Sequence, residues 1–282
     1  MSTSGYKRPM ACLIVMAAAS ARADVVEIVA SQDATLFEDA AGALADGGGP
    51  GLFAGYTLRN SSRFRRALLK FDLDAVPADA VILDVRLSLY VSRAISDNNP
   101  VTVHATTRQW SEGPTGAEGG GGGGGPAAPG DATWSHANWP SVAWSSPGGD
   151  FVARPVASAL VGYDGPVVWT STADFVSLVR RWQENPSSNH GLLLKGDETS
   201  NGSAKRFDSR EGSVPSRRPT LIVSFAPCPA DFNRDGGVDG ADVAGFFERW
   251  EQGDARSDVN LDGGVDGSDV ERFFLVWEAG GC

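Results

Sequence analysis

Two stretches near the C-terminal end of this 282-residue chain repeat the same pattern of oxygen-bearing side chains. One begins at Asp231 and the other at Asp258, 27 residues later. Each copy places an Asp or Asn at loop positions one, three, five, nine and twelve, and a glycine at position six. Ca²⁺ is a hard cation that binds about six to eight oxygen atoms, and a glycine allows the sharp bend with which a loop encloses the ion. The pattern therefore predicts two calcium loops rather than only a solvated acidic linker.

An amphipathic helix is expected directly after each loop, because apolar residues recur there at i, i+3, i+4 and i+7. These residues are Val243, Phe246, Phe247 and Trp250 after the first loop, and Val270, Phe273, Phe274 and Trp277 after the second. No helix is expected before either loop, since Pro227 and Pro229 precede the first and only seven residues separate Trp250 from Asp258. A paired EF-hand has a helix on both sides of each loop, so this unit is a different one. Its two helices are expected to bury their apolar faces against each other.

These features resemble a dockerin module over residues 228–282, and the ending Gly280-Gly281-Cys282 is similar to the dockerin variant that finishes on Gly-Cys. The resemblance implies two structural Ca²⁺ ions and a cohesin-like or other extracellular docking protein as partner. The implied ligands, with the glycines giving backbone carbonyls, are Asp231, Asn233, Asp235, Gly237, Asp239, Asp242, Asp258, Asn260, Asp262, Gly264, Asp266 and Asp269. Cellulosomal dockerins commonly carry a Ser-Thr pair at loop positions ten and eleven. This chain has Gly240-Ala241 and Gly267-Ser268 there, so the identity of the partner does not carry over.

The N-terminal segment is typical of a secretory signal. Lys7 and Arg8 precede an apolar run over 11–19, and Ala21-Arg22-Ala23 matches an A-x-A cleavage site. This predicts a signal peptide over 1–23 and a secreted protein that is extracellular or at the cell surface. The apolar run is too short for a bilayer, and no later segment is long and apolar enough, so no membrane span is expected.

Two cysteines remain beyond that segment, Cys228 and Cys282, and they bracket the calcium-loop unit. In an oxidising compartment this arrangement predicts a disulfide. On the chain-entropy model, closing a loop of this length stabilises the fold by about 4 kcal/mol. Such a bond matters for a module of about 55 residues, because a chain this short buries only a small core.

The charge of the chain excludes nucleic acid as an expected partner. The chain has 24 basic and 35 acidic residues, and residues 228–282 hold thirteen of the acids with only four basic residues. An acidic surface repels the anionic phosphate backbone.

The body of the chain, residues 24–226, is predicted to be mainly β. Short alternating or apolar runs, separated by turn-forming residues, occupy 25–29, 67–73, 81–91, 101–106, 152–160, 167–170, 191–195, 204–207 and 219–225. Many short strands favour a jelly-roll-like β-sandwich. One helix is expected over 173–185, covering an end or edge of the sandwich, and the glycine-rich segment 118–130 is expected to be a flexible loop insertion. The calcium-loop/helix pair over 227–282 completes the predicted domains.

Motifs spread in order through residues 30–225 resemble the DNRLRE domain. They lie at residues 65–73, 80–90, 110–113, 133–134, 179–182, 189–195 and 207–211. That family is a β-sandwich found beside secreted polysaccharide-degrading enzymes, and some members resemble carbohydrate-binding modules for acidic glycans such as alginate. The resemblance therefore implies that this domain binds polysaccharides, acidic polysaccharides included.

Aromatic rings and arginines are the candidate glycan contacts, because sugars stack on aromatic faces and Arg binds carboxylates in a bidentate manner. Trp139 and Trp144 are open between glycan contact and core, whereas Trp134 is expected in the core. Arg63 and Arg65 belong to a basic cluster with Arg59 and Arg66. A second cluster holds Lys205, Arg206, Arg210, Arg217 and Arg218. Structural ion pairs, for instance of Arg66 or Arg210 with Asp208 and Glu211, are the alternative role for these residues.

Signs of catalysis are few. The chain has no G-x-S-x-G or H-E-x-x-H motif, and His104, His136 and His190 show no metal-ligand spacing. The favoured interpretation is a secreted, non-catalytic protein that binds or structures extracellular polysaccharide and is anchored through a Ca²⁺-dependent module. A polysaccharide hydrolase or lyase with its site on the sandwich is one alternative. A purely structural cell-surface component is the other.

Overall fold

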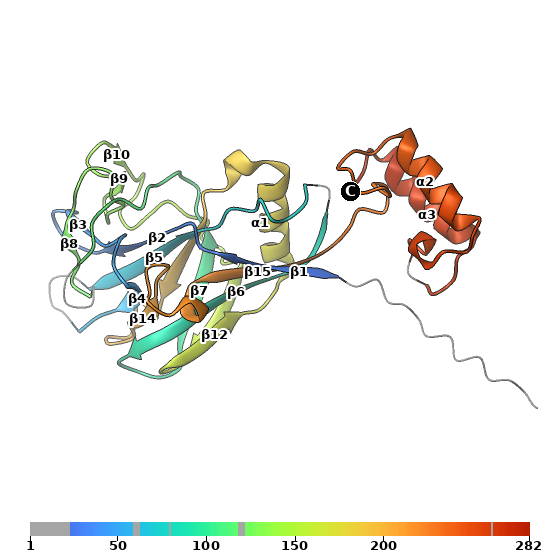
Figure 1. Cartoon of the computed structure of the whole chain (residues 1–282). Helices are drawn as coiled ribbons and strands as arrows, with labels where there is room; N and C mark the ends of the chain where they lie inside the picture. Colours follow the sequence, from blue (N-terminus) through green and yellow to red (C-terminus); the bar gives the residue numbers. More distant parts are fainter. Residues whose placement is uncertain (1–22, 59–62, 79, 118–121, 261) are drawn as a thin grey trace, which may run out of the picture. The chain divides into compact units, whose positions relative to one another are not determined.

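The computed structural model describes residues 23–58, 63–78, 80–117, 122–260 and 262–282. Almost all of the predicted signal peptide and residues 118–121 of the glycine-rich segment lie outside this description. The chain divides into two compact units, Ala23–Pro227 and Cys228–Cys282 (Figure 1). The protein is mainly β, with three α-helices in the described part of the chain.

The larger unit holds all of the strands. In chain order they are β1 (Asp24–Val29), β2 (Gln32–Phe37), β3 (Leu44–Ala45), β4 (Gly51–Tyr56), β5 (Phe64–Lys70), β6 (Val81–Ala94), β7 (Asn99–Ala105), β8 (Gly125–Pro126), β9 (His136–Asn138), β10 (Val142–Ala143), β11 (Ala157–Val161), β12 (Gly165–Trp169), β13 (Leu192–Gly196), β14 (Lys205–Asp208) and β15 (Thr220–Ala226). The helices of this unit are α1 (Ala173–Glu184) and the short 3-10 helices η1 (Pro186–Ser188) and η2 (Pro215–Arg217).

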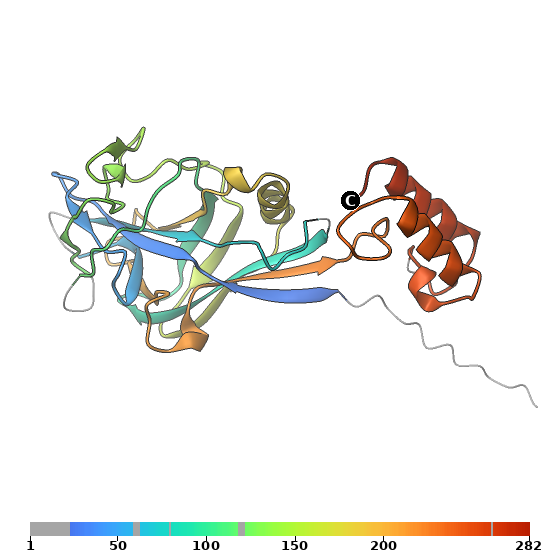
Figure 2. The same ribbon diagram turned by 45° about the horizontal axis from the view of Figure 1, so that its top comes forward.

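Eleven strands form one curled antiparallel sheet (Figures 1 and 2). Its order is β1-β15-β6-β14-β4-β5-β13-β7-β11, with β12 also paired to β6 and β2 to β5. Strand β4 joins two arms, because its first residues pair with β14 and its last two pair with β5. Gly55 permits this change of partner. Its φ is 118°, and a Cβ there would lie 2.8 Å from Cα of Ala204.

One hydrophobic core receives side chains from both arms of the sheet. Leu52 and Phe207 come from the β14 side, and Leu69 and Val103 from the β5 side. Strand β15 has strict alternation, with its buried residues on one face, as expected of a strand that covers a core on one side only.

The predicted helix over 173–185 is confirmed as α1. It begins after Thr172, whose hydroxyl oxygen accepts the N–H of Phe175 at 3.0 Å, and it ends before Pro186. Its apolar stripe, which includes Trp182, is buried in the same core. Gln183 donates side-chain hydrogen bonds to the carbonyls of Pro77 and Ala80, which fixes the helix near the start of β6.

A second core explains why some strands are apolar throughout. Leu68 and Leu193 point to the opposite face from Leu69, and there they pack with Trp110 and Trp144 from the segment 106–151. Strands β5 and β13 are therefore covered on both faces, so their sequences lose the alternation of a one-sided strand.

The described part of the glycine-rich segment has a defined place. Gly125 and Pro126 form β8, which pairs with β3, and Gly124 has a φ of 70°. A Cβ on Gly124 would lie 3.2 Å from Phe37, so a larger residue would disturb this contact. The described residues of this segment thus have a pairing partner in β3 and a packing partner in Phe37.

Asp46 predicts a pH dependence of folding stability. Its side chain is 2% exposed, and burial raises the pKa of its carboxyl to about 6. The folded state then binds a proton that the unfolded state has already lost, so the stability of the native chain falls as pH rises from about 4 to about 6. Replacing Asp46 by Asn removes the part of this fall that Asp46 causes, which is on the order of 2–3 kcal/mol.

Urea unfolding between pH 4 and pH 7.5 measures the effect. The exposed Asp74, changed to Asn, is the control and keeps the native pH profile. Parallel profiles for the native chain and the Asp46→Asn variant would contradict the raised pKa.

Candidate metal centres

The first loop of the unit Cys228–Cys282 is folded around carboxylate oxygens. Both oxygens of Asp231 accept backbone N–H groups, from Asp235 at 3.1 Å and from Gly236 at 3.0 Å. Gly236 has a φ of 86°, a value that residues other than glycine rarely adopt. The side-chain oxygen of Asn233 accepts a further N–H from Asp235 at 2.8 Å. The loop thus turns its acceptor oxygens inward, as a cation-binding loop must.

Asp242 joins this loop to the helix that follows. The carboxyl is fully buried, and its oxygens accept the N–H groups of Asn233 at 3.0 Å and Asp239 at 2.9 Å. Asp239 in turn accepts the N–H of Ala241, so the two acids form a capping box at the start of α2 (Gly240–Trp250). A single carboxylate therefore fixes both the beginning of the loop and the beginning of the helix.

The second loop repeats this arrangement bond for bond. Asp258 accepts from Asp262 and Gly263, and the fully buried Asp269 accepts from Asn260 and Asp266. The capping box recurs at the start of α3 (Gly267–Glu278). The two loop sequences differ at only three of twelve positions, none of them a predicted ligand position, and the hydrogen bonds of the first loop recur in the second.

The second loop has one additional group. The hydroxyl of Ser268 donates to Asp266 at 2.7 Å and accepts from the side chain of Asn260 at 2.6 Å, whereas the first loop has Ala241 at that position. This hydroxyl lowers the pKa of the Asp266 carboxyl, together with the backbone N–H of the same serine.

The two helices bury their aromatic stripes against each other, as predicted. The rings of Phe246 and Phe273, which occupy equivalent positions in the copies, stack at 4.4 Å with 11° between their planes. The indole N–H of Trp250 donates to the carbonyl of Asp266, and that of Trp277 donates to the carbonyl of Asp239. Each helix therefore ends on the loop of the other copy.

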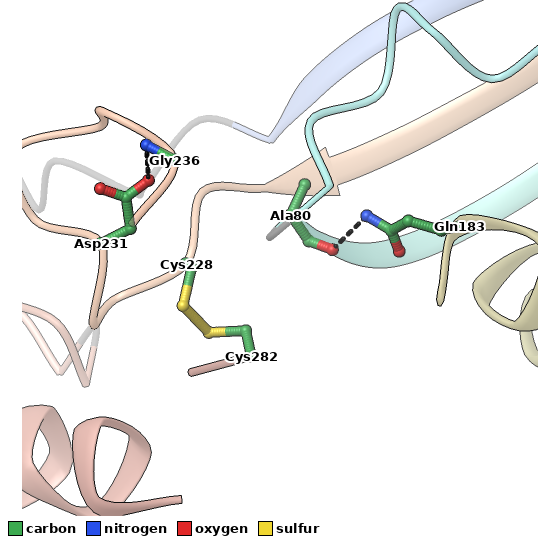
Figure 3. The surroundings of a disulfide bond; sticks show 6 residues. All are labelled: Ala80, Gln183, Cys228, Asp231, Gly236 and Cys282. Carbon is green, nitrogen blue, oxygen red and sulfur yellow. Dashed lines mark hydrogen bonds between the residues drawn. A yellow bond between two sulfur atoms is a disulfide. The ribbon is translucent and has the colours of Figure 1, made fainter. Parts of the chain in front are cut away.

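The predicted disulfide between Cys228 and Cys282 is confirmed. The two Cα atoms lie 5.6 Å apart, and the bond joins the ends of the unit across 54 residues (Figure 3). Figure 3 also shows Asp231 holding Gly236, a few residues along the chain from Cys228.

The donor set of both loops fits Ca²⁺. The predicted side-chain ligands of both loops are carboxylates and amides, whose oxygens hard cations prefer. Each loop carries four aspartates, and within the described residues no Lys or Arg forms an ion pair with any of them. The unit also contains the short 3-10 helix η3 (Ala255–Ser257), where Asp254 does pair with Arg249 and Arg256 outside the loops. Uncompensated carboxylates in a closed loop are the electrostatic condition for binding a divalent cation.

The candidate glycan contacts are only partly at the surface. Arg65 is fully buried, with its guanidinium over the ring of Phe37. Trp144 is 6% exposed, and its indole N–H donates to the carbonyl of Thr133. Neither can serve as a surface contact for a sugar, because neighbouring residues cover both side chains. Trp139 is half-buried against His136, and Arg63 is exposed.

Three arginines of the two basic clusters form ion pairs, the role that the alternative interpretation expected, and Arg210 pairs with Glu211 as suggested. Arg66 pairs with Glu198 at 2.7 Å and lies over the half-buried ring of Trp134. Arg206 pairs with Asp208 at 3.2 Å.

Arg217 and Arg218 differ, since both line a groove of about 210 Å³ on β1, β6, β12 and β15, which also holds the acid Glu27. The guanidinium of Arg217 lies 4.0 Å from the ring centre of Tyr90, which also lines the groove.

The three histidines lie apart from any site of this kind. His104 is buried between Thr102 and the carbonyl of Val152, and burial lowers its pKa. The pKa of His190 is lowered as well, and burial is the main cause.

One group of residues was not anticipated. Asp33, Glu112 and Glu211 each offer a carboxylate oxygen within 4.8 Å of the others, although about 180 residues separate the first from the last. No sequence spacing relates them, because the curled sheet alone brings them together.

Comparison with protein-family models and with curated proteins found no match for this chain. No helix in the described residues is long and apolar enough to cross a membrane.

Asp242→Asn tests the role of the buried loop carboxylates. An asparagine amide group in place of one carboxylate oxygen would face an N–H donor, and leaving one such donor unpaired costs about 1–3 kcal/mol. We expect faster hydrogen exchange at the amides of Asn233 and Asp239, measured by NMR on the full chain. The second loop provides the matched control, since the amides of Asn260 and Asp266 should keep their protection. Equal protection of both loops in the variant would contradict this role.

Proposed function

We propose that the unit Cys228–Cys282 binds two structural Ca²⁺ ions and attaches the protein to an extracellular docking protein. The observation that carries this proposal is the bond-for-bond repetition of a cation-binding loop geometry in two copies. Ligands would come from the inward-facing side chains of both loops and from the carbonyls of Gly237 and Gly264. The ions would supply positive charge at the centre of each loop and so fix the two helices in one arrangement.

Several features of the unit suit it to docking. It is closed by its own disulfide, and its helices pack on each other rather than on a longer chain segment. Leu275 on α3 is 63% exposed, and the residues at loop positions ten and eleven are exposed in both copies. These positions, Gly240-Ala241 and Gly267-Ser268, would select a partner different from one that recognises a Ser-Thr pair.

Calcium-dependent capture tests the docking proposal. The full chain, immobilised and exposed to the secreted fraction of its source cells, is expected to retain a partner in Ca²⁺ and release it in chelator. Direct calorimetry with the purified partner then measures the affinity. A chain with Asp231→Ala and Asp258→Ala should bind two fewer Ca²⁺ ions and lose the partner. Partner binding that persists in chelator, or in this variant, would refute the proposal.

For the larger unit we propose a non-catalytic, sandwich-type polysaccharide-binding role. The curled sheet with a core fed from both arms supports a β-sandwich of the carbohydrate-binding kind. The groove beside Tyr90 supports the choice of ligand, because Arg217 and Arg218 line it with guanidinium groups, and the Tyr90 ring holds that of Arg217. Guanidinium groups match the carboxylates of acidic polysaccharides.

Binding of alginate and of a neutral glucan, measured by affinity electrophoresis, tests this role. Replacing both Arg217 and Arg218 by Ala should weaken alginate binding at least tenfold. Arg154→Ala is the control, since Arg154 is an exposed arginine paired with Asp174 on α1. Cleavage of either polymer would favour the hydrolase or lyase alternative, and absence of both binding and cleavage would leave the purely structural one.

A further inference from the structure

The three carboxylates of Asp33, Glu112 and Glu211 converge in the larger unit, in a place separate from the loops and from the groove. Asp33 lies at the start of β2, Glu112 follows β7 in the segment 106–151, and Glu211 follows β14. The backbone N–H of Asp33 donates to Glu112 at 2.8 Å, so the strand and the segment are directly joined here.

Arg210 contacts all three acids, two through its guanidinium and Asp33 through its backbone N–H. The guanidinium of Arg210 contacts both oxygens of Glu112, at 2.7 and 2.5 Å, and one oxygen of Glu211 at 2.9 Å. The backbone N–H of Arg210 donates to Oδ2 of Asp33 at 2.7 Å. One positive charge against three ionised carboxylates leaves two negative charges in the cluster.

Two carboxylate oxygens of the cluster have no partner within the described residues. They are Oδ1 of Asp33 and Oε2 of Glu211, and both atoms are inaccessible to solvent. Asp33 as a whole is only 1% exposed. An unpaired buried polar atom costs about 1–3 kcal/mol, and more where the group is charged, so native proteins rarely leave one without a partner. Two such atoms on adjoining acids are acceptors to which a positive ligand can bind.

We propose that Asp33, Glu112 and Glu211 hold a divalent cation in the larger unit, as a third site besides the two loops. A divalent ion would cancel the two uncompensated charges and give both unpaired oxygens a partner. Three carboxylates would contribute part of the ligand shell, and backbone oxygens or water the remainder. Ligands that are all oxygen favour Ca²⁺, Mg²⁺ or Mn²⁺ over Zn²⁺, which prefers nitrogen and sulfur.

The electrostatics of the cluster are consistent with this site. Burial raises the pKa of the Asp33 carboxyl well above its usual range, and burial raises that of Glu211 as well, with neighbouring acids contributing to both. A bound cation would reverse these effects by stabilising the ionised forms. The competing explanation is a proton shared between Asp33 and Glu211, which would need no metal.

Such an ion would have a structural role. It would tie the start of β2 to the segment 106–151 and to the residues after β14, three parts of the chain that are far apart in sequence. Ion binding to the folded state alone raises its stability by mass action.

Calcium titration of the full chain separates this site from the loops. After removal of bound metal by chelation, calorimetry should show three Ca²⁺ ions on the native chain, one on the chain with Asp231→Ala and Asp258→Ala, and two on the Glu211→Gln chain. In the background of the two loop substitutions, Ca²⁺ should raise the melting temperature, and adding Glu211→Gln should weaken that binding at least tenfold. Glu184→Gln, at an exposed acid on α1, is the matched control and should retain full binding.

The outcomes distinguish the two proposals. No Ca²⁺ or Mn²⁺ bound in the loop-substituted background overturns the third site and supports the shared proton. One ion on the native chain that survives the loop substitutions supports the third site and refutes the loops. If Glu211→Gln fails to fold by circular dichroism, Asp33→Asn replaces it, and unchanged binding in that variant overturns the site.

Discussion

Buried carboxylates that accept backbone N–H bonds hold together the irregular parts of this protein. Helices and strands satisfy their own backbone groups, whereas loops need other acceptors. In the small unit Asp242 and Asp269 fill this need for both loops. In the large unit Asp131, fully buried, accepts the N–H groups of Thr115 and Ala128 and so fixes two turns of the long segment 106–151. Because ionised oxygens are strong acceptors, one side chain orders several residues of loop.

The small unit was predictable in detail because its chemistry is local. Each loop closes within twelve residues, its helix starts on a residue of the loop, and the repeat at 27 residues fixes which positions matter. The pairing of Phe246 with Phe273 follows from the same repeat, since each apolar stripe has only the other to cover it. The reciprocal bonds of Trp250 and Trp277 could not be predicted, because they depend on how the ends of the two helices meet.

The large unit was predictable only in outline. Mainly β character and α1 follow from periodicity, but the burial of Trp144 depends on the segment 106–151 covering one face of β5, and that of Arg65 on Phe37 at the other face. The apolar run in β5 is compatible with a strand covered on both faces, but it does not identify which segment covers each face. The cluster of Asp33, Glu112 and Glu211 has no sequence signature for the same reason. Contacts between distant segments depend on the path of the curled sheet, and no short sequence motif predicts that path.

The two units balance negative charge against stability in different ways. The small unit has thirteen acids and four basic residues on a core of a few aromatic rings, so charge repulsion is large relative to the apolar area that it buries. Its disulfide limits the unfolded state, and ions in the loops would remove repulsion from the folded one. The large unit buries a two-sided core and holds several of its arginines in ion pairs, so its fold has a larger apolar contribution than that of the small unit. A cation at Asp33, Glu112 and Glu211 would therefore stabilise one junction of loops, whereas cations at Asp231 and Asp258 would decide whether the small unit presents an ordered surface at all. This difference is why calcium would act as a condition for attachment rather than for the folding of the whole chain.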